Sequence, residues 1–202
     1  MFISRKAISL VVSSALSMAL IGSASAGGGG FTISSATFKD GGWLPTSMAW
    51  NDPSCTKGGT AGGNTSPELS WKNAPDGVRS FVVVAFDITA SFTHWGMYNI
   101  PVSTTTLPAG AGTASSTYGQ QTLNDFPLKG YDGPCPPAGV VPYAHHYLFT
   151  VYALDTRLVV PKFHNFPQYP EALLHVLADA GAQGHVLGSA TIGGYYSTTP
   201  AP

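Results

Sequence analysis

An acidic side chain and two imidazoles stand at the ends of the most apolar segments of this chain. Asp87 follows directly after the apolar run 80–86, and His94 comes next, after a predicted loop over 88–93. His145 opens another apolar segment, in which Tyr147 lies two residues further on. If these segments are neighbouring strands, the polar side chains gather at one end of a sheet and form a small polar pocket beside apolar strands.

Imidazole and hydroxyl groups in such a pocket would suit a small anion. A protonated imidazole makes charge-assisted hydrogen bonds to phosphate-type groups, and a phenol adds another donor. Side chains alternate along a strand, so Tyr147 shares a face with His145 while His146 points the other way. That parity argues against a metal held jointly by His145 and His146. Purely structural roles remain the alternative, with Asp87 capping a turn and the imidazoles packed in the core.

Common catalytic signatures are absent from the sequence. There is no HExxH, no GxSxG, no phosphate-binding GxxxxGK and no glycine-rich dinucleotide fingerprint. A hydrolase that uses Asp87, His94 and His145 as acid and base is therefore the weakest of the functions considered. We expect a protein that is not an enzyme and that needs neither a cofactor nor a metal.

Composition narrows the class of protein further. The 202 residues are 44% apolar and only 9% charged, with a formal net charge of −1. Because no basic patch stands out, nucleic acid is not an expected partner. The 24 glycines and 16 prolines imply many turns.

Hydrophobic patterning predicts a mostly β protein. The runs 80–86 and 146–154 are rich in β-branched and aromatic residues, which is typical of strands buried on both faces. Further strands are expected over 31–38, 95–100 and 186–192. A helix is expected over 170–180, with Pro170 at its start and Gly181 after its end. Long loops should cover 52–67 and 101–144, all within one domain over 27–202.

The first 26 residues have the features of a secretory signal peptide. Arg5 and Lys6 precede an apolar stretch over 7–22, and Ala24-Ser25-Ala26 is a small-residue cleavage pattern. The apolar stretch is too short and too rich in serine for a membrane span, so no transmembrane segment is expected in the mature chain. The sequence thus predicts a periplasmic or secreted protein after cleavage near Ala26.

If the protein is exported, its two cysteines, Cys55 and Cys135, enter an oxidising compartment. An even pair in an oxidising compartment is expected to form a disulfide, and each cysteine lies in a turn-rich segment. Two unrelated buried thiols are the alternative.

Several segments, taken in order, resemble the phosphatidylethanolamine-binding proteins, in the bacterial branch often called Raf-kinase-inhibitor-like. The resemblance runs from about Phe31 to Tyr196. It rests on the order and spacing of NTSPELSW at 64–71, SFVVV at 80–84, HW at 94–95, NIP at 99–101, GYDGPCPP at 130–137, HHYLF at 145–149 and GHVLGSA at 184–190.

The resemblance implies an antiparallel β-sandwich-like fold with a helix near the C-terminus. It also implies a small pocket that accepts phosphate-type anions such as phospholipid head groups. By the same likeness, the pocket residues are Asp87, His94, His145 and Tyr147, and Pro134 belongs to the loop that forms its wall.

Two departures from the family pattern affect that pocket. The family's DPDAP-type segment reads Asp87-Ile88-Thr89-Ala90-Ser91 here, so its second Asp and both prolines are missing and the rim should be less rigid. The family's HRY motif reads His145-His146-Tyr147, which replaces a fixed charge by one that titrates near neutral pH. We also expect Asp87 to favour the protonated form of a nearby imidazole.

The leading expectation is an exported protein that binds a small anion or a phospholipid head group. The alternative is a secreted inhibitor or interaction protein, which would act on an external partner such as a protease through the loops of 101–144.

Signal cleavage gives a direct test of the expected export. Mass spectrometry of protein recovered outside the cytoplasm should find a chain that begins at or near Gly27, because Ala24-Ser25-Ala26 fits the cleavage site. An exported chain that still carries residues 1–26 would contradict this prediction.

Overall fold

The computed structural model describes residues 30–162 and 169–199. The predicted signal peptide and its cleavage site lie outside the described residues. Across the described segments, no helix is both long and apolar enough to cross a bilayer.

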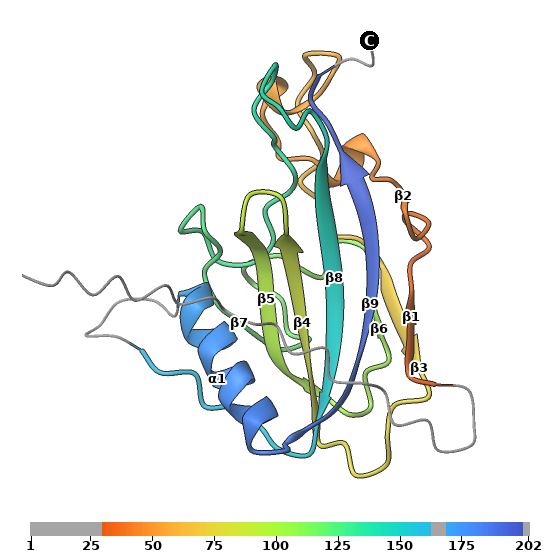
Figure 1. The fold of residues 1–202 in the computed structure, drawn as a ribbon, viewed down its shortest axis with the longest axis vertical. Helices are drawn as coiled ribbons and strands as arrows, with labels where there is room; N and C mark the ends of the chain where they lie inside the picture. Colours follow the sequence, from red (N-terminus) through yellow and green to blue (C-terminus); the bar gives the residue numbers. More distant parts are fainter. Residues whose placement is uncertain (1–29, 163–168, 200–202) are drawn as a thin grey trace, which may run out of the picture.

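Two β-sheets form the body of the protein (Figure 1). The larger sheet has the strand order β2 (Gly42–Trp43), β9 (Val186–Tyr196), β8 (His145–Leu154), β4 (Ser80–Asp87), β5 (Phe92–Pro101) and β7 (Gln120–Gln121). The smaller sheet has the order β1 (Thr32–Ser34), β3 (Leu69–Lys72) and β6 (Thr106–Leu107). Neighbours pair antiparallel except β2 and β9, which are parallel. The mostly β, sandwich-like fold is therefore confirmed.

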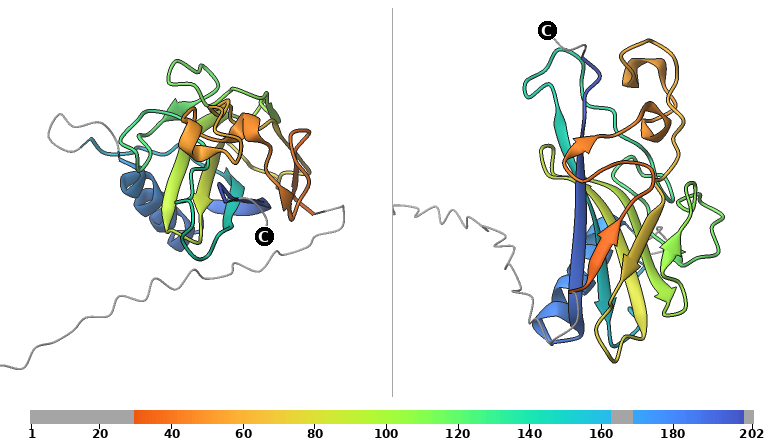
Figure 2. Two further views of the ribbon diagram at one scale, coloured as in Figure 1. Left: turned by 90° about the horizontal axis from the view of Figure 1, so that it is seen from above. Right: turned by 90° about the vertical axis from the view of Figure 1, so that its right-hand side faces the viewer.

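Strand β4 is buried on both faces, as its continuous apolar run predicts. One face, with Phe81 and Val83, packs in the core with Trp71 of β3. The other face, with Val82 and Val84, packs under the helix α1 (Pro170–Ala182). The two views of Figure 2 show that the helix and the smaller sheet cover opposite faces of the larger sheet.

The prediction that β8 is also buried on both faces is wrong. Its inward side chains, such as Phe149 and Val151, are buried, whereas the alternate positions of the strand are only half-buried. The reason is that one helix covers only part of the sheet: the cluster that α1 joins includes Tyr152 near one end of β8 but not Leu148.

Several strands differ in length from the prediction. Strand β5 begins at Phe92, so the turn after Asp87 has only the residues 88–91 and His94 lies inside the strand. Strand β9 continues to Tyr196 and passes through Gly193, where an added Cβ would lie 2.8 Å from the Nε2 of His146. The glycine thus makes room for a side chain of the neighbouring strand instead of ending β9.

The predicted disulfide is present, and it joins two loops. The short 3-10 helices η1 (Thr46–Met48) and η2 (Pro53–Cys55) lie in the first loop, and Cys55 is bridged to Cys135 in the second. Nearby, the Tyr196 hydroxyl donates to the Cys55 carbonyl at 2.8 Å, and the Thr198 hydroxyl donates to the Pro136 carbonyl at 2.7 Å. The end of β9 is thereby attached to both loops.

Removal of this bridge should destabilise the fold. The double variant Cys55→Ser/Cys135→Ser should lose up to about 4.5 kcal/mol of unfolding free energy, the chain-entropy value for a loop of this length. Urea denaturation of the oxidised wild type and of the variant measures the difference. Equal urea midpoints for the two proteins, or two free thiols in unreduced wild-type protein, would contradict this role of the disulfide.

Candidate functional site

A buried carboxylate–imidazole pair joins the ends of β4 and β8. In the register of the two strands Asp87 lies opposite Tyr147, which places His145 two residues beyond the end of β4. The Nδ1 of His145 lies 2.6 Å from the Oδ2 of Asp87, and both residues are buried. The strands therefore bring together the residues that sequence spacing placed at one end of the sheet (the upper end in Figure 1).

The second carboxylate oxygen of Asp87 caps the turn that follows. Its Oδ1 accepts hydrogen bonds from the backbone N–H groups of Thr89 at 2.8 Å and Ala90 at 3.1 Å. With His145 on Oδ2, three donors occupy most of the roughly four acceptor positions of the carboxylate. Asp87 is thus arranged to position His145 and the turn.

Hydrogen bonds to β8 hold the same turn in the absence of the family's two prolines. The His146 N–H donates to Oγ1 of Thr89 at 2.9 Å, and the Ile88 N–H donates to the His146 carbonyl at 3.0 Å. Ser91 closes the turn with a left-handed φ of 53°. The rim of the site is therefore attached to the adjacent strand through Ile88 and Thr89.

His94 is fixed by a backbone carbonyl. Its Nδ1 lies 2.7 Å from the carbonyl oxygen of Asp132, and the side chain is buried. A carbonyl only accepts, so Nδ1 must carry the hydrogen. The carboxylate of Asp87 imposes the same arrangement on His145. When neutral, each imidazole therefore has a lone pair on Nε2, and each donates from Nε2 only after protonation.

The pKa of His94 shifts opposite to the sequence-based expectation. Burial lowers it below the usual histidine value, and the Asp132 carbonyl and the charge of Asp87 only partly offset that effect. Asp87 does favour the protonated form, as expected, but the expected upward shift of the His94 pKa is wrong. Desolvation of the cation outweighs the attraction of the carboxylate.

Tyr147 lies near both imidazoles. Its ring centroid is 5.3 Å from that of His94 and 6.4 Å from that of His145. Burial raises the pKa of the Tyr147 phenol, and the neighbouring Asp87 carboxylate raises it further. The raised pKa keeps the phenol protonated at neutral pH, where it is a hydrogen-bond donor.

The predicted parity of β8 is confirmed. His145 and Tyr147 are buried on the inner face, whereas the His146 ring stacks on Tyr195 at 4.4 Å on the outer face. Within residues 30–162 and 169–199, no three His, Cys, Asp or Glu side chains are grouped so that they could hold a metal ion.

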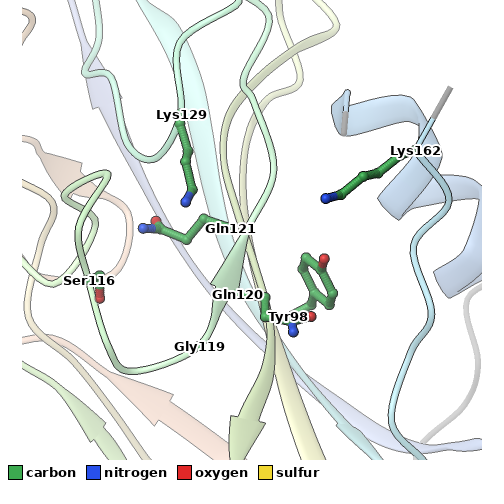
Figure 3. A pocket seen from close by; sticks show the side chains of 7 residues that line it. All are labelled: Tyr98, Ser116, Gly119, Gln120, Gln121, Lys129 and Lys162. Carbon is green, nitrogen blue, oxygen red and sulfur yellow. The ribbon is translucent and has the colours of Figure 1, made fainter. Parts of the chain in front are cut away.

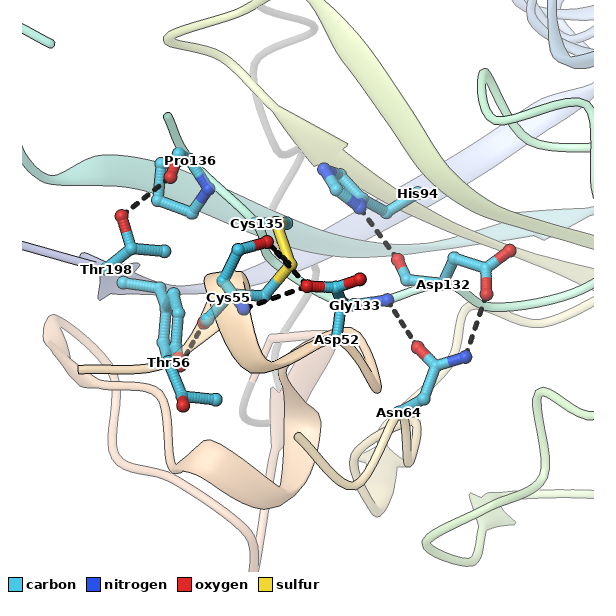
Figure 4. The surroundings of a disulfide bond; sticks show 12 residues. Asp52, Cys55, Thr56, Asn64, His94, Asp132, Gly133, Cys135, Pro136 and Thr198 are labelled. Carbon is cyan, nitrogen blue, oxygen red and sulfur yellow. Dashed lines mark hydrogen bonds between the residues drawn. A yellow bond between two sulfur atoms is a disulfide. The ribbon is translucent and has the colours of Figure 1, made fainter. Parts of the chain in front are cut away.

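Sequence reasoning missed the polar network that holds His94. The buried carboxylate of Asp132 accepts from the side-chain amide of Asn64 at 2.8 Å and from that of Asn124 at 2.6 Å. The Gly133 N–H donates to the Oδ1 of Asn64 at 2.8 Å (Figure 4). The position of Asp132 two residues before Pro134 was a usable signal, whereas nothing in the sequence pairs it with Asn64 or Asn124.

An aromatic wall beside His94 was missed as well. The rings of Phe92 and Phe126 lie 4.9 Å and 5.8 Å from the imidazole, and Trp50 packs on Phe126 at 4.4 Å. Phe126 and Trp50 come from loops, where no periodicity shows which side chains turn inward. These rings are the apolar surroundings of the His94 imidazole.

Pro134 is buried in the segment that connects Asp132 to the disulfide. Its carbonyl accepts from the Trp50 N–H at 3.2 Å, and Cys135 follows directly. A contact of Pro134 with a ligand stays a prediction.

Comparisons with known proteins agree with this architecture. The family model described as "Phosphatidylethanolamine-binding protein" matches residues 34–197. The chain is similar to YbcL of Escherichia coli, with 39% identity over 137 residues that cover 64% of this chain and 71% of that protein. It is also similar to LppC of Mycobacterium tuberculosis, which carries a lipoprotein name, with 31% identity over 166 residues, 78% of this chain and 71% of that protein.

Solved structures show the same likeness. The crystal structure of YbcL, whose title calls it a new member of the mammalian PEBP family, superposes with a TM-score of 0.68 at 33% identity. The match covers 83% of this chain and 98% of that one. This chain therefore belongs to the phosphatidylethanolamine-binding protein family.

The network around Asp132 can be tested by removal of one member. Asn124 is fully buried. Asn124→Ala removes the amide that donates to the Asp132 carboxylate, and it also removes the oxygen that accepts from two backbone N–H groups. We expect a loss of about 2 kcal/mol or more in unfolding free energy, since each orphaned buried polar group costs about 1–3 kcal/mol. The exposed Asn51→Ala is the matched control and should change stability by less than about 0.5 kcal/mol. If urea denaturation finds both variants equally stable, Asn124 does not support the network.

Proposed function

We propose that this protein is exported and binds a small phosphate-type anion, such as a phospholipid head group, at the site of His94, His145 and Tyr147. One observation carries the proposal: two buried imidazoles, each anchored through Nδ1, flank a phenol at one end of the larger sheet. Membership in a family named for phosphatidylethanolamine binding supports the choice of ligand.

In the proposed complex each residue has a distinct task. The protonated Nε2 groups of His94 and His145 and the hydroxyl of Tyr147 donate to the anion. Asp87 positions His145 and offsets its charge, because its oxygens are already engaged by the imidazole and the turn. We infer a binding role without turnover.

Export has its own support. A disulfide is typical of proteins outside the cytosol, and Cys55 and Cys135 form one. The relative LppC carries a lipoprotein name, and the first 26 residues have the pattern of a signal peptide. We place the protein in the periplasm or outside the cell.

A second candidate function rests on the loop before β8. Val140, Val141 and Tyr143 are all more than half exposed, with Val141 at 72%. Adjacent exposed apolar side chains of this kind mark interaction surfaces. This loop would serve an external protein partner such as a protease, and that activity would survive changes to His94.

Anion affinity should depend on pH, because both imidazoles are anchored through Nδ1 and only a protonated Nε2 can donate to the anion. Protonation of Nε2 creates a donor, so affinity for phosphoethanolamine should rise as pH falls from 9 toward 5. Since burial lowers the pKa of His94, its contribution should appear only below the ordinary histidine value of about 6.5. The rise should level off where the phosphate loses its second charge, near pH 6. Calorimetry over this pH range measures the profile.

Matched variants separate the imidazole charge from its structural role. Asn in place of His94 or His145 keeps a side-chain N–H near the position of Nδ1 but removes the titrating Nε2. Both variants should fold and bind with a flattened pH profile, and Tyr147→Phe should weaken binding at every pH. A wild-type profile that is already flat would contradict the site, and hydrolysis of a phosphate ester that is lost in His145→Asn would contradict a purely binding role. Inorganic phosphate and ethanolamine, titrated separately, show which half of the head group is recognised.

A further inference from the structure

A cavity lies away from these imidazoles, beside the edge strand β7. Its volume is about 350 Å³, within the usual range of small-molecule sites. Its walls come from β5, β7, the loop before β7, the loop after β7 and the segment before α1. The side chains that the argument uses are Tyr98, Ser116, Gln120, Gln121, Lys129 and Lys162.

Two ammonium groups approach this cavity from opposite sides. Lys129 comes from the loop after β7 and Lys162 from the segment before α1, and their side chains point into the same space above Gln121 and Tyr98 (Figure 3). Within the described parts of the chain, neither lysine forms an ion pair with a carboxylate. Two like charges that face one shared space repel each other, so an anion placed between them would be attracted by both.

The floor of the cavity is rigid and polar. The Oε1 of Gln121 accepts from the indole N–H of Trp95 at 2.7 Å, and its Nε2 donates to the Thr113 carbonyl at 2.5 Å. Both ends of the Gln121 amide are therefore fixed.

Further donors are available at the walls. The Oε1 of Gln120 accepts from the amide of Asn99 at 3.2 Å, which leaves the Gln120 N–H groups free to turn toward the cavity. The hydroxyl of Ser116 accepts from the Tyr118 N–H at 3.4 Å, and its own hydrogen remains available to donate. Among the described residues that line it, the cavity thus combines two positive charges with neutral donors and includes no carboxylate.

We propose that this cavity is a second, independent binding site for a compact oxyanion with two negative charges, either a phosphate-type group or a dicarboxylate. Lys129 and Lys162 act as point charges on the two sides of the anion, and Gln120 and Ser116 complete its hydrogen bonds. The site does not depend on the imidazole site, because it shares none of those residues.

A nuclear magnetic resonance titration of the 15N-labelled exported chain tests both sites at once. The backbone amides of Gly119 and Gln121 and the indole N–H of Trp95 report on the cavity. The amides of Thr89 and Ala90, which bond to Asp87, report on the imidazole site. Inorganic phosphate and malonate, added separately at pH 7.5 and constant ionic strength, distinguish the two ligand sources. We expect saturable shifts at the cavity amides with at least one of the two anions.

Lysine variants connect those shifts to the proposed contacts. Lys129→Gln and Lys162→Gln should each weaken binding at the cavity about tenfold, which is the low end of the effect of one hydrogen bond to a charged group. Lys72→Gln removes an exposed lysine of β3 and should leave the affinity unchanged. His94→Asn should likewise leave the cavity shifts unchanged.

Two outcomes would overturn the proposal. The first is that no saturable shift occurs at Gly119 and Gln121 with either anion up to about 10 mM. The second is that the affinity is the same in both lysine variants as in Lys72→Gln. Shifts confined to Thr89 and Ala90 would reject the cavity and support the imidazole site, whereas shifts confined to the cavity amides would support the cavity as a separate site.

Discussion

The candidate site depends on one constraint: each of its imidazoles has an acceptor on Nδ1. Asp87 supplies that acceptor for His145, and the Asp132 carbonyl supplies it for His94. These two hydrogen bonds set the tautomer of each ring, so the chemistry offered to a ligand is that of Nε2 alone. Without the Asp87 carboxylate, His145 would lose its partner and the turn at 88–91 would lose its cap, because the same side chain serves both.

The Asp132 carbonyl, which accepts from His94, lies in a loop, so its position depends on what holds that loop. Asp132 is held from one side by Asn64 and from the other by Asn124, while Cys135 attaches the same segment to Cys55 (Figure 4). The first loop in turn bonds to the end of β9 through the Tyr196 hydroxyl. Loops that are far apart in sequence thus form a support for one carbonyl oxygen. This arrangement accounts for a long, turn-rich region in a chain whose strands supply most of the remaining site residues.

Much of this arrangement could be predicted from residue patterns. The continuous apolar run of β4, the helical spacing of Leu173 and Leu177, and the parity of His145 and Tyr147 all report local geometry, and the structure confirms them. The network around Asp132 could not be predicted, because its members lie in loops, where no helical or strand periodicity indicates which side chains meet. The pKa of His94 was predicted in the wrong direction because spacing showed the nearby carboxylate but not the depth of burial. The half-buried outer face of β8 was missed for a similar reason: an apolar run does not reveal how far a single helix extends over a sheet.

The central claim is that both imidazoles present Nε2 to an anion. Long-range 15N–1H correlation spectra of the histidine rings measure it directly, since the 15N shift separates protonated from unprotonated ring nitrogens. At pH 8 without ligand, His94 should carry hydrogen on Nδ1 and none on Nε2, because burial lowers its pKa. With saturating phosphoethanolamine at pH 6, both rings should carry hydrogen on Nδ1 and on Nε2. A hydrogen on Nε2 of His94 at pH 8, or ring nitrogens that do not respond to the ligand, would contradict the account.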